Sequence, residues 1–197
     1  VLGSDFAVST TAEGVPKSSP LVLVLKEPHG NLRKEDERFV SMPWAGYAAD
    51  SEIEKIVRSG CIGANKIAAL RMDVDNLGRI FSDGLSGDGD SSYSLSRVAT
   101  LSRLITHFFK INIPQIASKP QNRLVEGALE GPRRMILVYS GGDDLFAIGA
   151  WNEIAEFSMD VAEKFRLYTG DNPSVTISGG MIMADDKAPV YHLADSA

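Results

Sequence analysis

The sequence predicts an α+β domain with a ferredoxin-like βαββαβ arrangement, which begins at about residue 65. Two observations lead to this prediction. Short apolar runs of strand length alternate with two longer stretches in which apolar residues recur every three or four positions. A glycine-rich turn separates the second apolar run from the third, which is typical of a β-hairpin. In this topology the four strands lie in the order 4-1-3-2.

The composition excludes several classes of protein. The 197 residues include 20 Lys and Arg against 26 Asp and Glu, which gives a formal net charge of −6. This acidic balance argues against a free-standing binder of nucleic acid or of anionic membranes. The lone Cys61 can form neither an internal disulfide nor a Cys-based zinc site. Since no apolar run approaches the roughly 18 residues that a membrane helix needs, we expect a cytoplasmic protein.

The first third of the chain differs from the rest. Residues 1–61 predict a mixed, largely irregular N-terminal segment with short strands, of which the apolar run 21–25 is one. The charged stretch 27–38 predicts a solvated loop. Residues 62–197 form the second predicted domain, and its last helix starts at Pro189 and is truncated by the end of the sequence.

The first strand and the first helix of the second domain follow from periodicity. The apolar run 67–74 has the length of a strand and ends in Asp-Asn-Leu-Gly, which has the composition of a turn. Residues 93–112 carry apolar side chains at helical spacing, and Pro114 is expected to block extension of that helix. Residues 118–132 contain Pro and Gly and predict a loop.

The remaining elements complete the fold. Residues 135–139 and 145–150 predict the two strands of the hairpin. A second helix is expected over residues 153–168, with Asn152 as its N-cap. Residues 174–183 predict the fourth strand.

Four carboxylates are predicted to meet at one edge of this sheet. Asp73 and Asp75 close the first strand, and Asp143 and Asp144 lie in the hairpin turn. In the predicted topology these two places lie at the same edge. Carboxylates so close together would repel one another strongly at neutral pH unless a cation lay among them. Oxygen ligands of this kind suit Mg²⁺ or Mn²⁺.

The two motifs suggest separate roles. Asp75 lies further into the turn, so Asp73 is the safer metal ligand, and the carbonyl of Val74 offers a third oxygen. Gly141 and Gly142 have no Cβ and allow positive φ, so that a phosphate chain can approach the turn amides. A pair of metals there would catalyse in-line displacement at phosphorus. Each motif alone is commonly a structural turn, and it is their coincidence that favours a metal–phosphate site.

Four separated motifs carry a family resemblance. In this order they closely resemble the GGDD-bearing palm domain in the large subunit of type III-A (Csm) CRISPR effector complexes: LRMDVDNLGRIFSDGL, SLSRVATLSRLITHFF, ILVYSGGDDLFAIGAW, and VTISGGMIM with the following KAPVYHLADSA. The resemblance covers about residues 62–197 and implies a palm fold related to polymerases and to GGDEF-type nucleotide cyclases.

The resemblance also implies an activity. When its complex binds target RNA, such a domain polymerises ATP into 3′–5′ cyclic oligoadenylate second messengers with two metal ions, Mg²⁺ or Mn²⁺. The implied partners are ATP, the other subunits of the complex, guide RNA and target RNA. The implied catalytic residues and metal ligands are Asp73, Asp143 and Asp144, and Gly141 and Gly142 match the turn that passes under the triphosphate.

Three small polar residues complete the predicted nucleotide site. Ser140, Asn76 and Ser178 lie near enough by topology to contact ribose or adenine, although such residues beside turns are often structural. Family members also carry an N-terminal HD nuclease, whereas none of the three histidines here is followed by Asp. We therefore expect a fragment without that nuclease, weak or inactive alone.

Two other functions remain open. A diguanylate cyclase of the GGDEF class would keep the fold, but Asp144 stands where that class uses Glu. A catalytically silent palm could serve as a scaffold in an RNA-guided complex. Against the scaffold, acids are intact at every expected metal position, although they repel one another.

Overall fold

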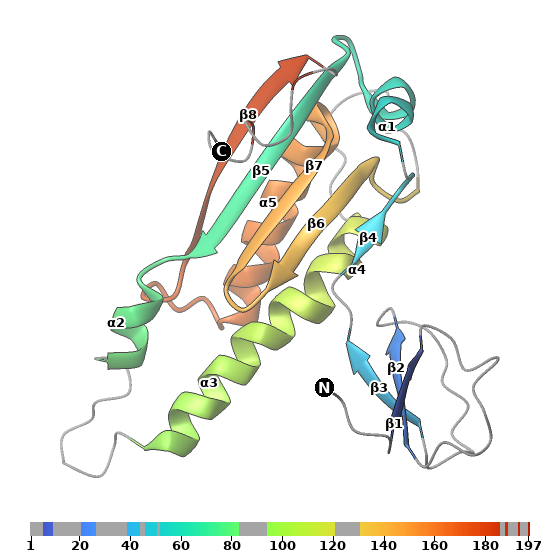
Figure 1. Cartoon of the computed structure of the whole chain (residues 1–197). Helices are drawn as coiled ribbons and strands as arrows, with labels where there is room; N and C mark the ends of the chain where they lie inside the picture. Colours follow the sequence, from blue (N-terminus) through green and yellow to red (C-terminus); the bar gives the residue numbers. More distant parts are fainter. Residues whose placement is uncertain are drawn as a thin grey trace. The chain divides into compact units, whose positions relative to one another are not determined.

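The chain, seen in a computed structural model, forms two compact units, residues 1–44 and residues 45–197 (Figure 1). The first unit contains a parallel sheet of β1 (Phe6–Ser9), β2 (Leu21–Lys26) and β3 (Phe39–Pro43), paired in that order. β2 confirms the strand predicted from the apolar run, whereas the predicted loop 27–38 lies outside the described residues. The structure describes residues 6–9, 21–26, 39–43, 46–50, 52–82, 94–120, 131–185, 188, 193 and 197.

The second unit is built on an antiparallel sheet, whose strands lie in the order β4-β6-β7-β5-β8. Without β4 this is the predicted 4-1-3-2 order, so the ferredoxin-like fold is confirmed. The predicted strands are all present, and their ends differ from the prediction by no more than three residues. Within the described residues the strands are β4 (Tyr47–Ala48), β5 (Lys66–Val74), β6 (Met135–Gly141), β7 (Asp144–Ala150) and β8 (Ile177–Asp185).

The second unit begins earlier in the chain than we expected. β4 pairs with β6 through Tyr47 and Ala48, and helix α1 (Ile53–Gly60) packs beside β7. These contacts place residues 45–61 in the second unit, whereas composition had suggested a boundary after residue 61. The difference arises because an edge strand of two residues is too short to produce a periodic pattern.

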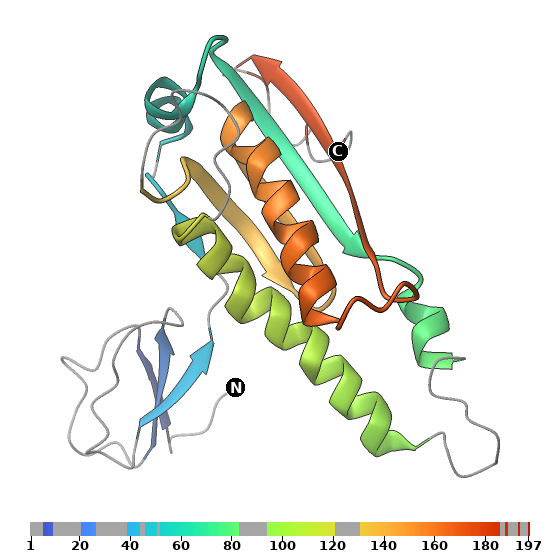
Figure 2. The same ribbon diagram turned by 180° about the vertical axis from the view of Figure 1, so that it is seen from behind.

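Helices cover one face of the sheet. α3 (Leu95–His107), a π-helical turn (Phe108–Asn112) and α4 (Ile113–Ser118) form one rod, and α5 (Trp151–Tyr168) lies beside it on the same face (Figure 2). The short α2 (Leu77–Ser82) follows β5. None of the helices in the described part of the chain is long and apolar enough to cross a membrane.

The two faces of β5 serve different purposes. Alternate residues, namely Ala68, Leu70, Met72 and Val74, enter the main core between the sheet and the helices. On the opposite face a smaller cluster contains Val57, Ile67, Ala69, Phe146, Ile148 and Leu193. Further along that face Arg71 and Asp73 are exposed, so the surface changes from apolar to charged toward the end of the strand.

We predicted that Pro114 would block extension of the first long helix, but the helical rod continues through it into α4. The amide of Ile113 bonds to the carbonyl of Phe108, five residues back, and the wider π turn accommodates the proline ring. Pro114 has no amide to offer to the carbonyl of Phe109. The buried hydroxyl of Ser140 donates to that carbonyl instead, at 2.7 Å. This bond ties the rod to β6 immediately before the hairpin turn.

Several local predictions need correction. Asn152 is not the N-cap of α5, which begins one residue earlier; its side chain is buried and bonds to the amide of Ile62 and the carbonyl of Gly60. The predicted turn after Asp75 opens into α2, because the amides of the first helical turn bond to the carbonyl of Asn76. Of the last predicted helix, which starts at Pro189, only residues 193 and 197 are described.

A buried ion cluster joins α5 to the start of β6. Arg133 is fully buried, and its guanidinium contacts three carboxylates of α5 that are also buried. Its Nη1 lies 3.4 Å from Glu153 Oε2 and 3.0 Å from Glu156 Oε2, and its Nη2 lies 2.5 Å from Asp160 Oδ2. Charge-assisted bonds of this kind fix geometry when the ions are fully partnered.

Candidate active site

Strand register brings the predicted acids together. The pairing of β5 with β7 sets Asp73 directly opposite Asp144, and the hairpin sets Gly141 opposite Asp144. The turn therefore consists of Gly142 and Asp143. Gly142 has φ of 67°, which a residue without a Cβ adopts at no cost and which type II′ hairpins require at this position. The amide of Val74 donates to the carbonyl of Asp143 at 3.1 Å and holds the turn against β5.

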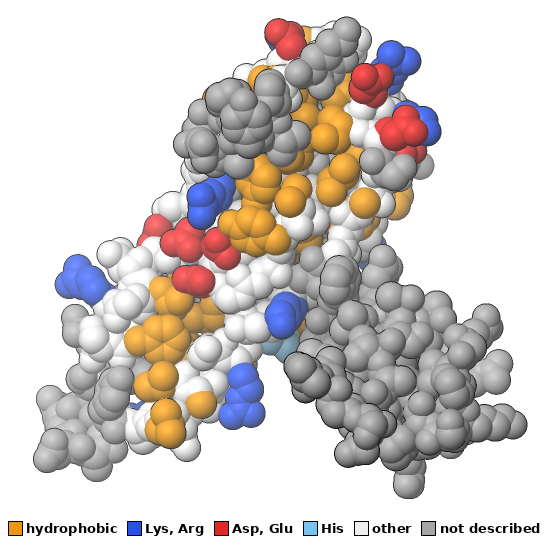
Figure 3. Space-filling view, viewed as in Figure 1, with side chains coloured by type: hydrophobic (Ala, Val, Ile, Leu, Met, Phe, Trp, Pro, Cys, Tyr) orange, Lys and Arg blue, Asp and Glu red, His pale blue; other side chains and the backbone are white. Residues whose placement is uncertain are grey.

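The acidic end of the sheet lies on the face opposite α3, α4 and α5. Residues opposite one another in an antiparallel pair share a face, so Asp73 and Asp144 lie on the face that also carries Arg71. Figure 3 shows acidic side chains gathered beside basic ones at the end of an apolar area. The smaller apolar cluster and the charged edge thus lie on the same face of the sheet, one after the other along β5.

The carboxylates influence one another electrostatically. Partial desolvation raises the pKa of Asp73 above its ordinary 3.8, and the negative charges of Asp143 and Asp144 raise it further. The guanidinium of Arg71 opposes this shift in pKa but does not cancel it. The protein therefore concentrates negative charge at this point, which a bound cation would relieve.

Asp144 is held by two residues that we did not predict from the sequence. The hydroxyl of Tyr139 donates to Asp144 Oδ2 at 2.8 Å, and Arg71 Nη2 lies 3.9 Å from the same oxygen. Burial first, and then the bond to Asp144, raise the pKa of Tyr139. Arg71 interrupts an otherwise apolar strand two positions before Asp73, and that spacing was the signal that could have identified it.

Asp75 is engaged by side chains at the start of β8, and one of them, Ser178, lies opposite Asp73 in the pairing of β5 with β8. The carboxylate of Asp75 accepts a bond from Thr176 Oγ1 at 2.6 Å. Hydrogen bonding from Ser178, and then from Thr176, lowers its pKa below the ordinary value. Asp75 also has the smallest effect among the charges that act on Asp73. The structure thus brings Asp73, Asp143 and Asp144 together and engages Asp75 and Ser178 with each other.

The other two predicted nucleotide contacts have local roles. The hydroxyl of Ser140 is buried and bonded to the carbonyl of Phe109. Asn76 has φ of 53°, which Asn tolerates better than most residues, and its carbonyl starts α2 by accepting from the amides of Arg79 and Ile80. In this conformation both residues stabilise the fold around the site.

The carboxylate oxygens at this edge suit a hard cation, although in this conformation they are not arranged as a metal-ligating group. In the part of the chain that the structure describes, no three His, Cys, Asp or Glu side chains form a metal-ligating group. Asp144, moreover, is bonded to Tyr139. The donor set of carboxylate oxygens nevertheless matches the preference of Mg²⁺ and Mn²⁺. Desolvation and then the charges of Asp143 and Asp144 raise the pKa of Asp73, and such an ion would offset the repulsion among the three carboxylates.

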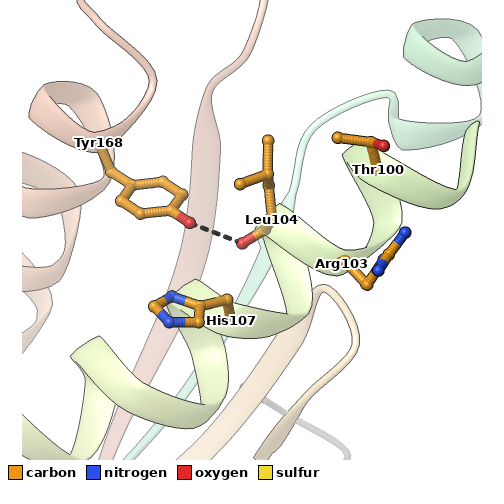
Figure 4. Close-up of a pocket in the computed structure, with 5 residues that line it drawn as sticks. All are labelled: Thr100, Arg103, Leu104, His107 and Tyr168. Carbon is orange, nitrogen blue, oxygen red and sulfur yellow. Dashed lines mark hydrogen bonds between the residues drawn. The ribbon is translucent and has the colours of Figure 1, made fainter. Parts of the chain in front are cut away.

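A separate pocket lies on the helical side. It has a volume of about 440 Å³ and is lined by Thr100, Arg103, Leu104 and His107 of α3 and by Tyr168 of α5 (Figure 4). Tyr168 closes one side by donating its hydroxyl to the carbonyl of Leu104 at 2.9 Å. The pocket contains none of the predicted site residues, so the acidic face is the better candidate for chemistry.

Comparison with protein families identifies the second unit. Residues 66–197 match the family described as Cas10/Cmr2, second palm domain. The chain is 35% identical over 154 residues to the CRISPR system single-strand-specific deoxyribonuclease Cas10/Csm1 (subtype III-A) of Mycobacterium tuberculosis, covering 77% of this chain and 19% of that protein. The protein of the same description from Streptococcus thermophilus is 37% identical over 134 residues, covering 68% and 16%. The chain thus spans less than a fifth of the length of these relatives.

Solved structures with the same fold contain nucleotides. A Csm1–Csm4 cassette in complex with one ATP has a TM-score of 0.71 and 29% identity, over 93% of this chain and 26% of that one. A cassette with pppApApA gives a TM-score of 0.70 and 29% identity, over 93% and 26%. A cassette with cA4 gives 0.66 and 30% identity, over 81% and 23%. With the fold, the register of its acids and these similarities in agreement, the chain belongs to the family of the Cas10/Cmr2 second palm domain, whose matched relatives are Cas10/Csm1 proteins of type III-A CRISPR systems.

Proposed function

We propose that this chain carries a nucleotidyltransferase site that converts ATP into 3′–5′ cyclic oligoadenylate when its type III-A effector complex binds target RNA. One observation carries the proposal. The pairing of Asp73 with Asp144, together with the two-residue turn, collects Asp73, Asp143 and Asp144 at one exposed edge of a palm sheet. The ATP, pppApApA and cA4 in the similar Csm1–Csm4 cassettes support adenine nucleotides as ligands.

The side chains divide the work of such a site. Asp73, Asp143 and Asp144 would hold Mg²⁺ or Mn²⁺, which would supply positive charge for the attacking and leaving oxygens of a displacement at phosphorus. Arg71 and Tyr139 hold the carboxylate of Asp144 in place while no metal ion is bound.

The turn itself suits a phosphate chain. Gly142 leaves the space beside the turn open, since a Cβ placed there would meet no atom within 4 Å. Backbone amides in a glycine turn can donate to phosphate oxygens. In the proposed reaction the 3′-hydroxyl of one ATP gives up its proton to water and its oxygen bonds to the α-phosphorus of the next. The bond from that phosphorus to the β-phosphate oxygen breaks, and pyrophosphate leaves.

The test is the double substitution Asp143→Ala and Asp144→Ala in the complete effector complex. Incubation with ATP, Mn²⁺ and target RNA, followed by mass spectrometry, should show that oligoadenylate formation falls by at least about a hundredfold, because the charge that holds the metals is lost. The urea midpoint of unfolding should change little, since these acids make few contacts that stabilise the fold.

Asp185→Asn is the matched control. It removes a carboxylate from the opposite end of β8, where Asp185 forms an exposed pair with Lys66, and it should leave product formation unchanged. Survival of oligoadenylate synthesis in the double variant would contradict the site assignment. Turnover of GTP in place of ATP would favour the GGDEF-like cyclase, and no turnover of either nucleotide would favour a scaffold.

A further inference from the structure

Lys110 reaches the glycine turn from the helical layer. A Cβ placed on Gly141 would lie 3.9 Å from Lys110 Cε, in ordinary van der Waals contact. Gly141 pairs directly with Asp144, so this position points toward the face that carries the acids. The stem of Lys110 therefore passes beside β6 and brings its amine to the rim of the proposed site.

A π turn and a hydrogen bond from Ser140 position Lys110 beside the glycine turn. The π turn that contains Lys110 comes just before Pro114, and the amide of Ile113 donates to the carbonyl of Phe108. Pro114 has no amide to donate to the carbonyl of Phe109. Ser140 supplies that donor at 2.7 Å. The bond joins the residue before Lys110 to the residue before Gly141, so the two following residues lie side by side.

The charge of Lys110 is not used inside the described part of the protein. The residue is half-buried, and no carboxylate in that part lies within ion-pair distance of its amine. Arg71 already acts as the internal cation of the acids, since it contacts Asp144 and lowers the pKa of Asp73. A half-buried ammonium group beside a glycine turn is suited to an anion from outside, and phosphate is a common ligand of such lysines.

We propose that Lys110 is a phosphate-binding residue whose ammonium group contacts the polyphosphate of a nucleotide lying over Gly141 and Gly142. This inference rests on the proposed function, because it takes a nucleoside triphosphate as the ligand of the turn. It adds a cation from the helical layer to a site otherwise built from two strands and a turn. Lys110 should therefore distinguish ATP from AMP, which lacks the terminal phosphates.

The experiment compares Lys110→Met, which keeps the apolar stem, with Lys110→Arg, which keeps the charge. In the complete effector complex, calorimetry gives the Kd for ATP and for AMP, and turnover gives KM and kcat. Lys110→Met should raise Kd and KM for ATP about tenfold or more, as expected for losing a charge-assisted bond. AMP affinity should stay within about twofold, and Lys110→Arg should recover most of the ATP affinity.

Arg103→Met is the matched control on the same rod. It removes an exposed positive charge from the pocket of Figure 4, and ATP affinity should not change. Unchanged ATP affinity in Lys110→Met, or an equal loss for ATP and AMP, would overturn the inference. If the wild-type complex bound ATP but formed no oligoadenylate, the proposed function would fail, whereas the binding measurements would still decide the role of Lys110.

Discussion

Two groups of three carboxylates in the same domain differ in how their charge is balanced. Glu153, Glu156 and Asp160 surround Arg133 with contacts of 2.5 to 3.4 Å, and all four side chains are buried. Among the described residues, the ion-pair partner of the acids at the sheet edge is Arg71, which lies 3.9 Å from Asp144 and is 55% exposed. Each group has one guanidinium for three carboxylates, but the first holds its guanidinium in close contact and out of water, whereas the second lies at an exposed edge that a cation from solution can reach.

The two groups are also positioned by different forces. The buried acids depend on the ion pairs themselves, because a carboxylate out of water is costly without a partner. The acids at the edge depend on backbone pairing, namely the register of β5 with β7 and the bond from Val74 to Asp143. Removing a charge should therefore damage the fold in the first group and the chemistry in the second.

The largest expected effect is on the buried group. Arg133→Met would leave three buried carboxylates without the guanidinium that they contact, and we expect the free energy of unfolding to fall by about 3–5 kcal/mol. Urea denaturation followed by circular dichroism measures this loss. Arg134→Met is the matched control, because Arg134 is partly exposed and, within the described part of the chain, its guanidinium bonds to the nearby carbonyl of Pro132 and to no carboxylate. Equal midpoints for the two variants would remove the distinction between the groups.

A smaller effect should come from the turn that positions the edge acids. Gly142→Ala forces a residue with a Cβ to keep φ of 67°, which costs about 1–2 kcal/mol of stability. Gly141→Ala is the comparison, since Gly141 has no positive φ and the nearest atom to an added Cβ is 3.9 Å away. Thermal unfolding should therefore show a lower midpoint only for Gly142→Ala. If both variants unfolded alike, backbone conformation would not be what holds Asp143 and Asp144 in place.

The smallest expected effect is a difference between Asp73 and Asp75 in how each contributes to stability as the pH changes. The pKa of Asp73 is raised, so ionising it costs stability as the pH rises through its folded pKa; Asp73→Asn should be slightly more stable than wild type at pH 7. The pKa of Asp75 is lowered, so its contribution is present above its ordinary pKa of 3.8 and disappears as the pH falls through the folded value; Asp75→Asn should be less stable at pH 7.

Urea midpoints between pH 3 and pH 7 measure both differences. Each difference from wild type should shrink on acidification, and the two should have opposite signs. A shared sign would show that Asp73 is not under repulsion from Asp143 and Asp144, which would weaken the case for a cation at this edge.

Much of the candidate site was predictable because it depends on local pattern. The end of an apolar strand located Asp73, and the glycine pair located Asp143 and Asp144 in a turn. The topology that brings them together follows from the order of the elements. Residues whose role depends on contacts across layers were not predictable in the same way. Tyr139 is aligned with Asp144 only through an irregularity in the pairing of β6 with β7.

The sequence by itself determined the ferredoxin-like fold, the family and the three acids, because periodicity, turn composition and motif order are properties of neighbours along the chain. The tertiary structure alone decided where the remaining groups go. It turned Asp75 toward Thr176 and Ser178, used the hydroxyl of Ser140 to complete a π turn, and brought Lys110 beside Gly141. These placements depend on strand register and on packing between layers, which join residues that are far apart in sequence.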